Sequence, residues 1–272
     1  MAIDFNELLN ELRLIAPREL EEEWDNGGLQ INMGNKEVNK VLITLEITEE
    51  VIKEAVKLNV DFIVTHHPLL FKKIDVVDAT SVVGNYIIKL IQYGITVYSA
   101  HTAFDSVFGG NNDYLADMIG LQKVRRLKKW TPTGDKELIG RVGTFAEPAS
   151  LKEIANNLQS VLKLKEHVKI VGNPDKLIET AAICTGAGGD AIEAVIRSGC
   201  DLFITGDVRH HEAQMAREMG LCLIDAGHYG TEYFFVENFA NKLRKATEDK
   251  LEVLESNVIV NPFDSMVYYF SE

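Results

Sequence analysis

The 272-residue sequence has few cysteines and no long apolar run, and each shortage excludes a class of protein. Its 3 cysteines, Cys184, Cys200 and Cys222, lie in or beside expected strands without C-x-x-C spacing, which indicates small buried side chains in a reducing compartment. No run approaches the roughly 18 apolar residues that a membrane span needs. The acidic residues of segment 1–17 favour an amphipathic helix over a signal peptide. We therefore expect a cytoplasmic protein.

Basic residues are also scarce: the sequence has 28 lysines and arginines against 41 aspartates and glutamates, which gives a formal charge of −13. Such a charge repels polyanions at long range, so binding to nucleic acid is not expected. The basic cluster 123–130 could still contact phosphates, although a solvated strand and linker is the simpler interpretation. With 46% hydrophobic residues, the chain can bury the core of one or two compact domains.

Apolar strands alternate with amphipathic helices in the first half of the sequence. The pattern predicts a strand over 41–47, a helix over 48–59, a strand over 60–67, a helix over 81–94 and a strand over 95–105. Alternation of this kind is typical of a parallel or mostly parallel sheet flanked by helices.

The second half repeats this order. A strand over 180–186, a helix over 188–199 and a strand over 200–207 match the first half at an offset of 140, and a helix over 210–220 and a strand with a turn over 221–232 follow. The sequence therefore predicts an α/β protein of two related halves that arose by internal duplication.

The join between the halves is expected in segment 124–140, which is rich in charge, glycine and proline. We place the first half at 1–125, closed by the C-terminal segment 231–272 with a helix and a strand, and the second half at 126–250. Ser150 is the expected N-cap of a further helix in the second half.

Two histidines, His66 and His67, stand side by side at the end of an apolar strand, and Pro68 stops that strand. Chance predicts roughly 0.2 adjacent pairs among 7 histidines in 272 residues, whereas two are present. Six of the seven histidines fall at or just past expected strand ends, and His167 alone lies elsewhere. In open α/β sheets, ligands bind beyond the carboxyl ends of the strands.

Two further strand ends, which the repeat aligns with each other, carry a histidine followed four residues later by a carboxylate: His101 with Asp105, and His228 with Glu232. Imidazole and carboxylate together suit a divalent ion such as zinc, manganese, iron or nickel. Five such ligands would saturate one tetrahedral ion, whereas two ions sharing them keep positions open for water, so we favour a dinuclear centre. The candidate ligands are His66, His67, Asp105, His228 and Glu232.

Each candidate has a simpler interpretation. His66 could be a core histidine bonded to a backbone carbonyl, Asp105 could only shape a turn, and Glu232 could only complement a helix dipole. The role of His101 is open between metal ligand, proton relay and orienting partner of a carboxylate. Those of Glu46, Asp207 and His211 stay open as well.

Two glycine-containing segments suggest weaker alternatives. Segment 185–191 loosely matches a dinucleotide-binding turn, but the acidic residue at its expected spacing, Asp207, belongs to a strand end crowded with histidines. Segment 24–30 contains the tight-turn pair Asn-Gly, and its Trp24 and Asp25 could border a pocket.

Five motifs in order, WDNGGLQ, THHPLLF, SAHTAFD, TGDVRHHEA and DAGHYGTE, resemble the Nif-three-like proteins, also called GTP cyclohydrolase 1 type 2 homologues, of the YbgI type. The resemblance covers nearly the whole chain and implies the short form, without an inserted domain. It implies a homohexameric ring, a dinuclear metal centre and the five ligands chosen above. Glu46 stands where the family is expected to have aspartate.

The functional hypothesis is hydrolysis of a small nucleotide-like substrate by water activated between two divalent ions. The family's name suggests GTP, although nothing in the sequence is typical of a purine pocket. The alternative is a metal-binding scaffold without turnover, which stores, delivers or senses metal as a ring of identical chains. The sequence leaves the native metal and the substrate open.

Overall fold

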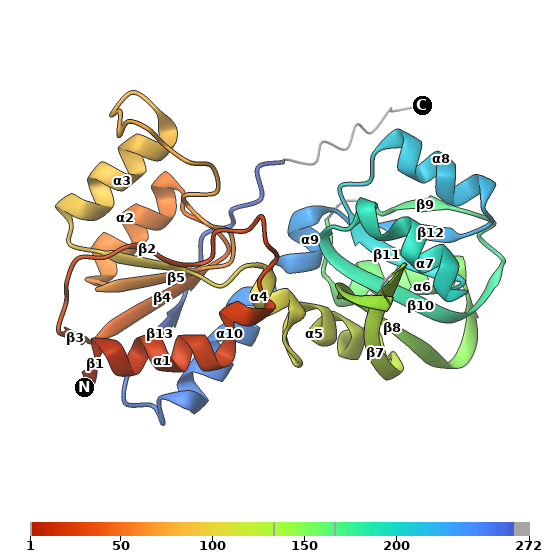
Figure 1. Cartoon of the computed structure of the whole chain (residues 1–272), viewed down its shortest axis with the longest axis horizontal. Helices are drawn as coiled ribbons and strands as arrows, with labels where there is room; N and C mark the ends of the chain where they lie inside the picture. Colours follow the sequence, from red (N-terminus) through yellow and green to blue (C-terminus); the bar gives the residue numbers. More distant parts are fainter. Residues whose placement is uncertain (1, 133, 166, 264–272) are drawn as a thin grey trace, which may run out of the picture. The chain divides into compact units, whose positions relative to one another are not determined.

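The structure, a computed structural model, describes residues 2–132, 134–165 and 167–263 (Figure 1). The chain forms two compact units. Of the described residues, unit 1 contains those of 2–111 and Tyr233–Val260, and unit 2 contains those of 112–232 and 261–263. The division falls after Asn111, and segment 124–140, where we expected the join, lies within unit 2.

A five-stranded mixed sheet forms the centre of unit 1, with the order β13-β4-β5-β6-β2. Its strands are β2 (Gly28–Ile31), β4 (Lys40–Thr44), β5 (Phe62–Thr65), β6 (Thr96–Ser99) and β13 (Glu252–Glu255). The first four strands in the sheet order pair in parallel, and β2 pairs antiparallel with β6. The C-terminal strand β13 thus forms one edge of the sheet of unit 1.

Helices cover both faces of this sheet, with α2 and α3 on one side and α1 and α10 on the other (Figure 1). Each helix has the apolar stripe that such a position requires; α1 buries Leu8, Leu9 and Leu12 and is capped by the carboxylate of Asp4. Their bounds are α1 (Phe5–Ile15), α2 (Glu49–Leu58), α3 (Val82–Gln92) and α10 (Phe235–Ala246), and shorter elements are β1 (Ile3–Asp4), β3 (Glu37–Val38), η1 (Arg18–Leu20) and α4 (Thr102–Ser106). Helix α5 (Asn111–Met118) begins at the division.

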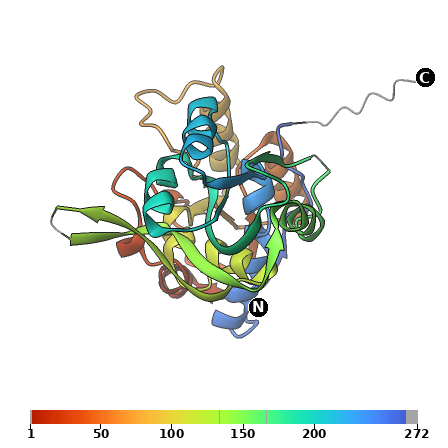
Figure 2. The same ribbon diagram turned by 90° about the vertical axis from the view of Figure 1, so that its right-hand side faces the viewer.

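Unit 2 contains a six-stranded mixed sheet in the order β7-β8-β10-β11-β12-β9. Its strands are β7 (Gln122–Thr131), β8 (Gly134–Ser150), β9 (Lys169–Val171), β10 (Leu177–Ala187), β11 (Leu202–Gly206) and β12 (Cys222–Asp225). Only β10, β11 and β12 pair in parallel, so the prediction of mostly parallel sheets is wrong for this unit. Strands β7 and β8, which the basic segment 123–130 helps to form, are an antiparallel hairpin whose far ends extend as a ribbon (Figure 2).

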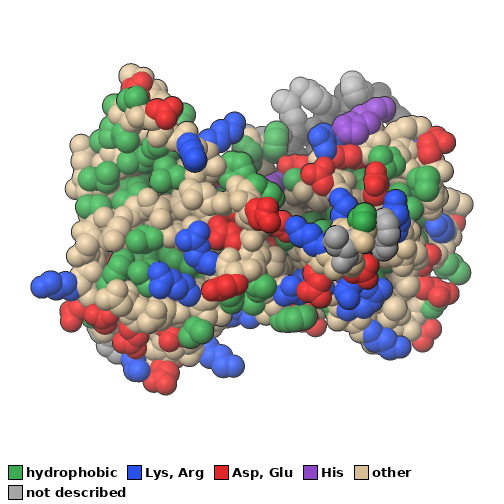
Figure 3. All heavy atoms as spheres, viewed as in Figure 1, with side chains coloured by type: hydrophobic (Ala, Val, Ile, Leu, Met, Phe, Trp, Pro, Cys, Tyr) green, Lys and Arg blue, Asp and Glu red, His purple; other side chains and the backbone are tan. Residues whose placement is uncertain are grey.

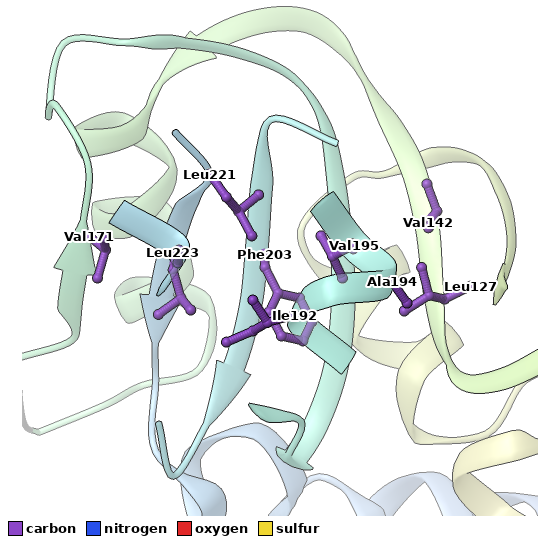
Figure 4. Close-up of a cluster of buried hydrophobic side chains, with 11 residues drawn as sticks. Leu127, Val142, Val171, Ile192, Ala194, Val195, Phe203, Leu221 and Leu223 are labelled. Atoms are coloured by element: carbon purple, nitrogen blue, oxygen red, sulfur yellow. The ribbon is translucent and has the colours of Figure 1, made fainter. Parts of the chain in front are cut away.

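Helix α7 (Ile192–Ser198) packs on one face of this sheet, and α8 (His210–Glu218) contributes to the same core (Figure 4). Phe203 of β11 lies at the centre of this apolar cluster, between Leu223 of β12 and the side chains of α7. Helix α6 (Leu151–Val161) begins at Ser150, which forms a capping box with Glu153, so the predicted N-cap is confirmed. The remaining short helices are η2 (Gly189–Ala191) and α9 (His228–Glu232).

Acidic and basic side chains are interspersed over the face of the molecule in Figure 3, as is typical of a solvated surface. Within the described residues, no helix combines the length and the apolar character needed to cross a bilayer.

The two parallel ladders have the same register. Phe62 lies opposite Val41 in unit 1, and Leu202 lies opposite Ala181 in unit 2. Each residue of the unit 1 pair therefore stands 140 positions before its counterpart in unit 2. In the next ladder, Phe62 lies opposite Thr96 and Leu202 opposite Cys222. The offset has therefore changed to 126 at the third strand, because the second unit has a shorter connection there.

This register corrects the alignment of His101 with His228, which requires an offset of 127. At the structural offset of 126, His101 corresponds to Gly227, and α4 corresponds to α9. The two histidine-carboxylate motifs recur at similar places without being equivalent positions. The expected strand over 95–105 is also too long, since β6 ends at Ser99 and Asp105 lies in α4.

An aspartate repeats at equivalent positions of the two sheets. The Asp61 Oδ2 atom accepts hydrogen bonds from the backbone N–H groups of Asn39 and Lys40, at 2.7 and 3.0 Å. Asp201 Oδ2 accepts the corresponding bonds from Glu179 and Thr180, at 3.1 and 3.0 Å. Each aspartate directly precedes one strand and thus fastens it to the backbone just before the paired residues of the neighbouring parallel strand.

Replacing either aspartate with alanine is expected to destabilise its own unit by about 1 to 2 kcal/mol, because two backbone donors lose a charged acceptor. Hydrogen exchange should quicken locally, at residues 39–40 in Asp61→Ala and at 179–180 in Asp201→Ala. Glu179→Ala, which removes an exposed acid beside the second site, serves as the control. Unchanged exchange at those amides would show that the bonds do not hold the strands together.

Candidate metal centre

The carboxyl end of β5 carries the adjacent histidines. The backbone N–H groups of His66 and His67 both donate to the carbonyl of Leu45, at 3.0 and 2.9 Å, so the chain turns directly after the strand. Ser99 Oγ donates to the His66 carbonyl at 2.7 Å, and Thr65 Oγ1 donates to the His67 carbonyl at 2.8 Å. The two ring centroids lie 5.1 Å apart. Two consecutive imidazoles therefore share one side instead of pointing to opposite faces.

The orientation of the buried His66 ring is fixed by its Nδ1 atom, which lies 3.0 Å from the Ala100 carbonyl oxygen. A carbonyl only accepts, so Nδ1 donates, and Nε2 faces Asp105 Oδ2 at 3.6 Å. Two atoms bound to one ion at about 2.1 Å lie roughly 3.0 to 3.4 Å apart in octahedral or tetrahedral geometry. The observed separation is close to that range.

Asp105 is a buried carboxylate in α4, and its Oδ1 atom accepts a hydrogen bond from Asn111 Nδ2 at 2.9 Å. The loop between the two residues turns tightly at Gly110, where a Cβ atom would lie 1.7 Å from the Phe104 carbonyl oxygen. A buried carboxylate is costly without positive charge or donors around it. This placement suits a carboxylate that binds a cation.

His101 belongs to the same cluster through a partner that is distant in sequence, Asp25. His101 Nδ1 lies 2.8 Å from Asp25 Oδ1, and Thr102 donates to Asp25 Oδ2 through its backbone N–H at 3.1 Å and through its hydroxyl. One nitrogen atom each of His66, His67 and His101 lies within 4.8 Å of the others. Unit 1 therefore gathers three imidazoles that could hold a metal ion.

The Asp25 side chain is fully buried, and its environment stabilises the ionised form. Burial by itself raises the pKa of Asp25, but the hydrogen bond and charge of His101, with the Thr102 hydroxyl and the Asn26 N–H, lower the pKa from 3.8 to about 2. An ionised Asp25 accepts the Nδ1 proton of His101. Nε2 of His101 is then the nitrogen that can bind an ion or take up a proton.

Unit 2 presents its own pair of donors on α9. His228 Nε2 lies 3.0 Å from Glu232 Oε2, within the range expected for two ligands of one ion. His228 Nδ1 lies 2.8 Å from Asp207 Oδ2, so a carboxylate fixes this ring as Asp25 fixes His101. Asp207 has a φ of 52°, a left-handed conformation that few non-glycine residues adopt without a local reason.

Gly186 leaves room for the Glu232 carboxylate. Its φ is +68°, and a Cβ atom there would lie 2.2 Å from Glu232 Oε1 and 3.3 Å from His228 Nε2. The Gly186 N–H donates to Thr231 Oγ1 at 2.9 Å, which fastens the end of β10 to α9. Glycine at this position therefore permits the close approach of strand and ligand pair.

The residues whose roles the sequence left open take different positions. Glu46 Oε2 lies 3.8 Å from His67 Nδ1, and Asp207 orients His228, whereas His211 lies exposed in the first turn of α8. His167 is exposed, as expected. Glycines of segment 185–191 allow neighbouring side chains to pack closely against the backbone. A Cβ atom at Gly188 would clash with the side chain of Thr205, and one at Gly189 with that of Glu212.

Sequence reasoning missed the bond between Asp25 and His101, because the Asn-Gly pair after Asp25 reads first as a turn. The aspartate before that turn, beside a tryptophan, was the available signal. Within unit 1 the structure brings His66, His67 and Asp105 together, and within unit 2 it brings His228 and Glu232 together.

The fold and these donors define a two-unit α/β protein with a candidate metal site in each unit, at the carboxyl ends of parallel strands. The family model Duf34/NIF3 (NGG1p interacting factor 3) matches residues 3–262, so the chain belongs to this family. The resemblance drawn from the five sequence motifs is thereby confirmed.

The chain is similar to a GTP cyclohydrolase 1 type 2 homolog of Clostridium perfringens, at 36% identity over 259 residues, which cover 95% of this chain and 98% of the relative. A Bacillus cereus protein related to NIF3 shares the fold, with a TM-score of 0.88 at 22% identity over 97% of this chain and 99% of that one. Reduced HcgD from Methanocaldococcus jannaschii has a TM-score of 0.78 at 31% identity, over 95% and 99% of the two chains.

The buried bonds of Asp25 predict a pH-dependent contribution to stability. A folded pKa of about 2 against 3.8 stabilises the native state by about 2 kcal/mol above pH ~4, and this contribution decreases as the pH falls toward 2. Asp25→Asn should lose that amount at neutral pH in urea unfolding. The difference between wild type and variant should shrink below pH 4, and a difference independent of pH would contradict the assignment.

The tight contact at Gly186 predicts a selective loss of metal binding. Gly186→Ala should displace Glu232 and weaken the binding of Zn²⁺ or Mn²⁺ by about 10- to 100-fold in calorimetric titration. Gly199→Ala is the matched control, because Gly199 has a similar φ of +74° with nothing within 4 Å of its Cβ position. Equal metal affinities in the two variants would show that the contact does not position a ligand.

Proposed function

We propose that the protein is a metal-dependent hydrolase with a dinuclear divalent-metal centre, acting on a small nucleotide-like substrate. One observation carries the proposal: each unit presents an imidazole nitrogen and a carboxylate oxygen at 3.6 and 3.0 Å, with the other ring nitrogen held by an acceptor. Imidazole fixed in this way is the usual arrangement of a metal ligand. Such an arrangement of imidazole, carboxylate and acceptor is not expected to occur by chance in both units.

The proposed centre combines the donors of the two units. The ions would be held by His66, His67, Asp105, His228 and Glu232. The shared register of the two parallel ladders supports this arrangement, because it indicates two halves related by internal duplication, each with its ligands beyond corresponding strand ends. Imidazole and carboxylate accept zinc, iron, manganese and nickel, so the donor set restricts the metal only to this group.

The residues around the ions have distinct roles in the proposed reaction. Bound divalent ions would supply a water with a pKa lowered to about 7, and hence a nucleophile at neutral pH. His101 Nε2 would receive or return a proton, and ionised Asp25 would stabilise the resulting imidazolium across the 2.8 Å bond. Asp207 would keep His228 in the tautomer that presents Nε2.

Membership of the family supports our proposals for the substrate and the assembly. The name of the Clostridium perfringens relative, GTP cyclohydrolase 1 type 2 homolog, suggests a purine nucleotide as substrate and hydrolytic opening of its ring. We further propose a homohexameric ring of identical chains in the cytoplasm.

A non-catalytic scaffold that stores, delivers or senses metal is the second candidate. His101 favours it, because its nitrogen lies within 4.8 Å of those of His66 and His67 and would add a sixth protein ligand. A centre filled by protein ligands leaves less room for a reacting water.

Elemental analysis and an activity screen separate the two functions. Protein purified without added metal should contain close to two ions per chain, and the metal-replete protein should hydrolyse a nucleotide or phosphoester. His66→Ala should lose metal and at least about 100-fold in rate, whereas His167→Ala, an exposed histidine, should retain both. Full metal content without metal-dependent turnover on any of these substrates would establish the scaffold instead.

A further inference from the structure

Two aromatic side chains lie exposed beside the histidine cluster of unit 1. Trp24 is 59% and Phe71 is 52% exposed to solvent. Leaving large apolar rings in water forgoes the stabilisation that their burial would supply. A single exposed ring would need no explanation, but two in contact beside titratable side chains are typical of a binding site.

The two rings and His101 are arranged edge to face. The centroids of Trp24 and Phe71 lie 6.0 Å apart at 68°, and those of Trp24 and His101 lie 5.9 Å apart at 75°. Phe71 and His101 complete the triangle at 6.2 Å and 81°. An edge-to-face pair covers an edge of one ring and one face of the other, so two rings packed in this way keep further faces available for stacking.

A hydrogen-bonded frame holds the two aromatic segments together. Asn26 Nδ2 donates to the Leu70 carbonyl at 2.7 Å, and the Leu70 N–H donates to Gln30 Oε1 at 3.0 Å. Gln30 Nε2 donates to the Asn26 carbonyl at 2.7 Å. Asp25, between Trp24 and Asn26, is itself fixed to His101. The rings therefore stand on segments whose positions are already determined, which lowers the entropic cost of binding.

We propose that Trp24 and Phe71 form a stacking platform for a planar heteroaromatic ring, which lies against them next to His101. The identification of this ring as part of the substrate rests on the proposed function. A flat ring can stack on one of the two aromatic faces while its edge meets the other, an arrangement that a flexible aliphatic chain cannot reproduce. The exposed Lys72 and Lys73 directly follow Phe71 and can neutralise a phosphate on such a ligand.

Fluorescence of Trp24 tests the platform directly. The chain has 2 tryptophans, so Trp130→Phe leaves Trp24 as the only one. The full-length, metal-replete protein is titrated with guanosine monophosphate and with ribose 5-phosphate, which has the sugar and phosphate but no ring. The nucleotide should quench the emission with saturation, and ribose 5-phosphate should not.

Matched variants assign the binding to the platform. In the same background, Phe71→Leu should weaken nucleotide binding roughly 10- to 100-fold, and Phe71→Tyr should restore it, because stacking needs a flat ring. Tyr93→Leu removes another exposed aromatic ring of unit 1, at the end of α3 that precedes β6, and should leave binding unchanged. Calorimetry checks the same order of affinities without relying on emission.

Equal binding of both ligands, or unchanged nucleotide binding in Phe71→Leu, would overturn the platform. A change of oligomer mass in Trp24→Leu, with nucleotide affinity retained in calorimetry, would also overturn it and identify the rings as a contact between chains. Binding of the nucleotide ring without hydrolysis would support the platform and contradict the proposed hydrolase function. Hydrolysis of phosphoesters without binding of the ring would support the hydrolase function and contradict the platform.

Discussion

The positions of the candidate ligands depend mainly on parallel strands that end side by side in each sheet. In unit 1, Thr65 of β5 lies opposite Ser99 of β6, so the residues that follow, His66 and His101, emerge at one edge of the sheet. In unit 2, Thr205 lies opposite Asp225, and Asp207 and His228 follow. Backbone pairing alone aligns these strand ends. The candidate ligands are therefore brought together by the core of each unit, and the loops only complete their positions.

A second constraint acts on the rings themselves. The Nδ1 atom of His66 meets the Ala100 carbonyl, that of His101 meets Asp25, and that of His228 meets Asp207. Each contact selects the tautomer whose Nε2 atom faces the donor cluster, so little reorganisation is needed when a cation binds. A chain with a formal charge of −13 that also buries Asp105 and Glu232 gains from a bound cation, which would compensate their charge.

Local signals made much of this architecture predictable from the sequence. Apolar periodicity identified α2, β5 and α7, and side-chain chemistry identified the cap at Ser150, because these features depend on neighbouring residues. A solvated strand was expected within 123–130, but the antiparallel pairing of β7 with β8 was missed, because these charged strands lack an apolar alternation. The equivalence of His101 with His228 was misjudged by one position, because register depends on pairing in space. The bond of Asp25 to His101 spans 76 positions, beyond any local pattern.

The central proposal is that ligands of both units hold one pair of ions. Anomalous diffraction at the absorption edge of the bound metal, from crystals of metal-replete protein, tests it most directly. We predict two peaks close together, contacted by His66, His67 and Asp105 from unit 1 and by His228 and Glu232 from unit 2. Peaks ligated by a single unit, or none at these side chains, would contradict the account.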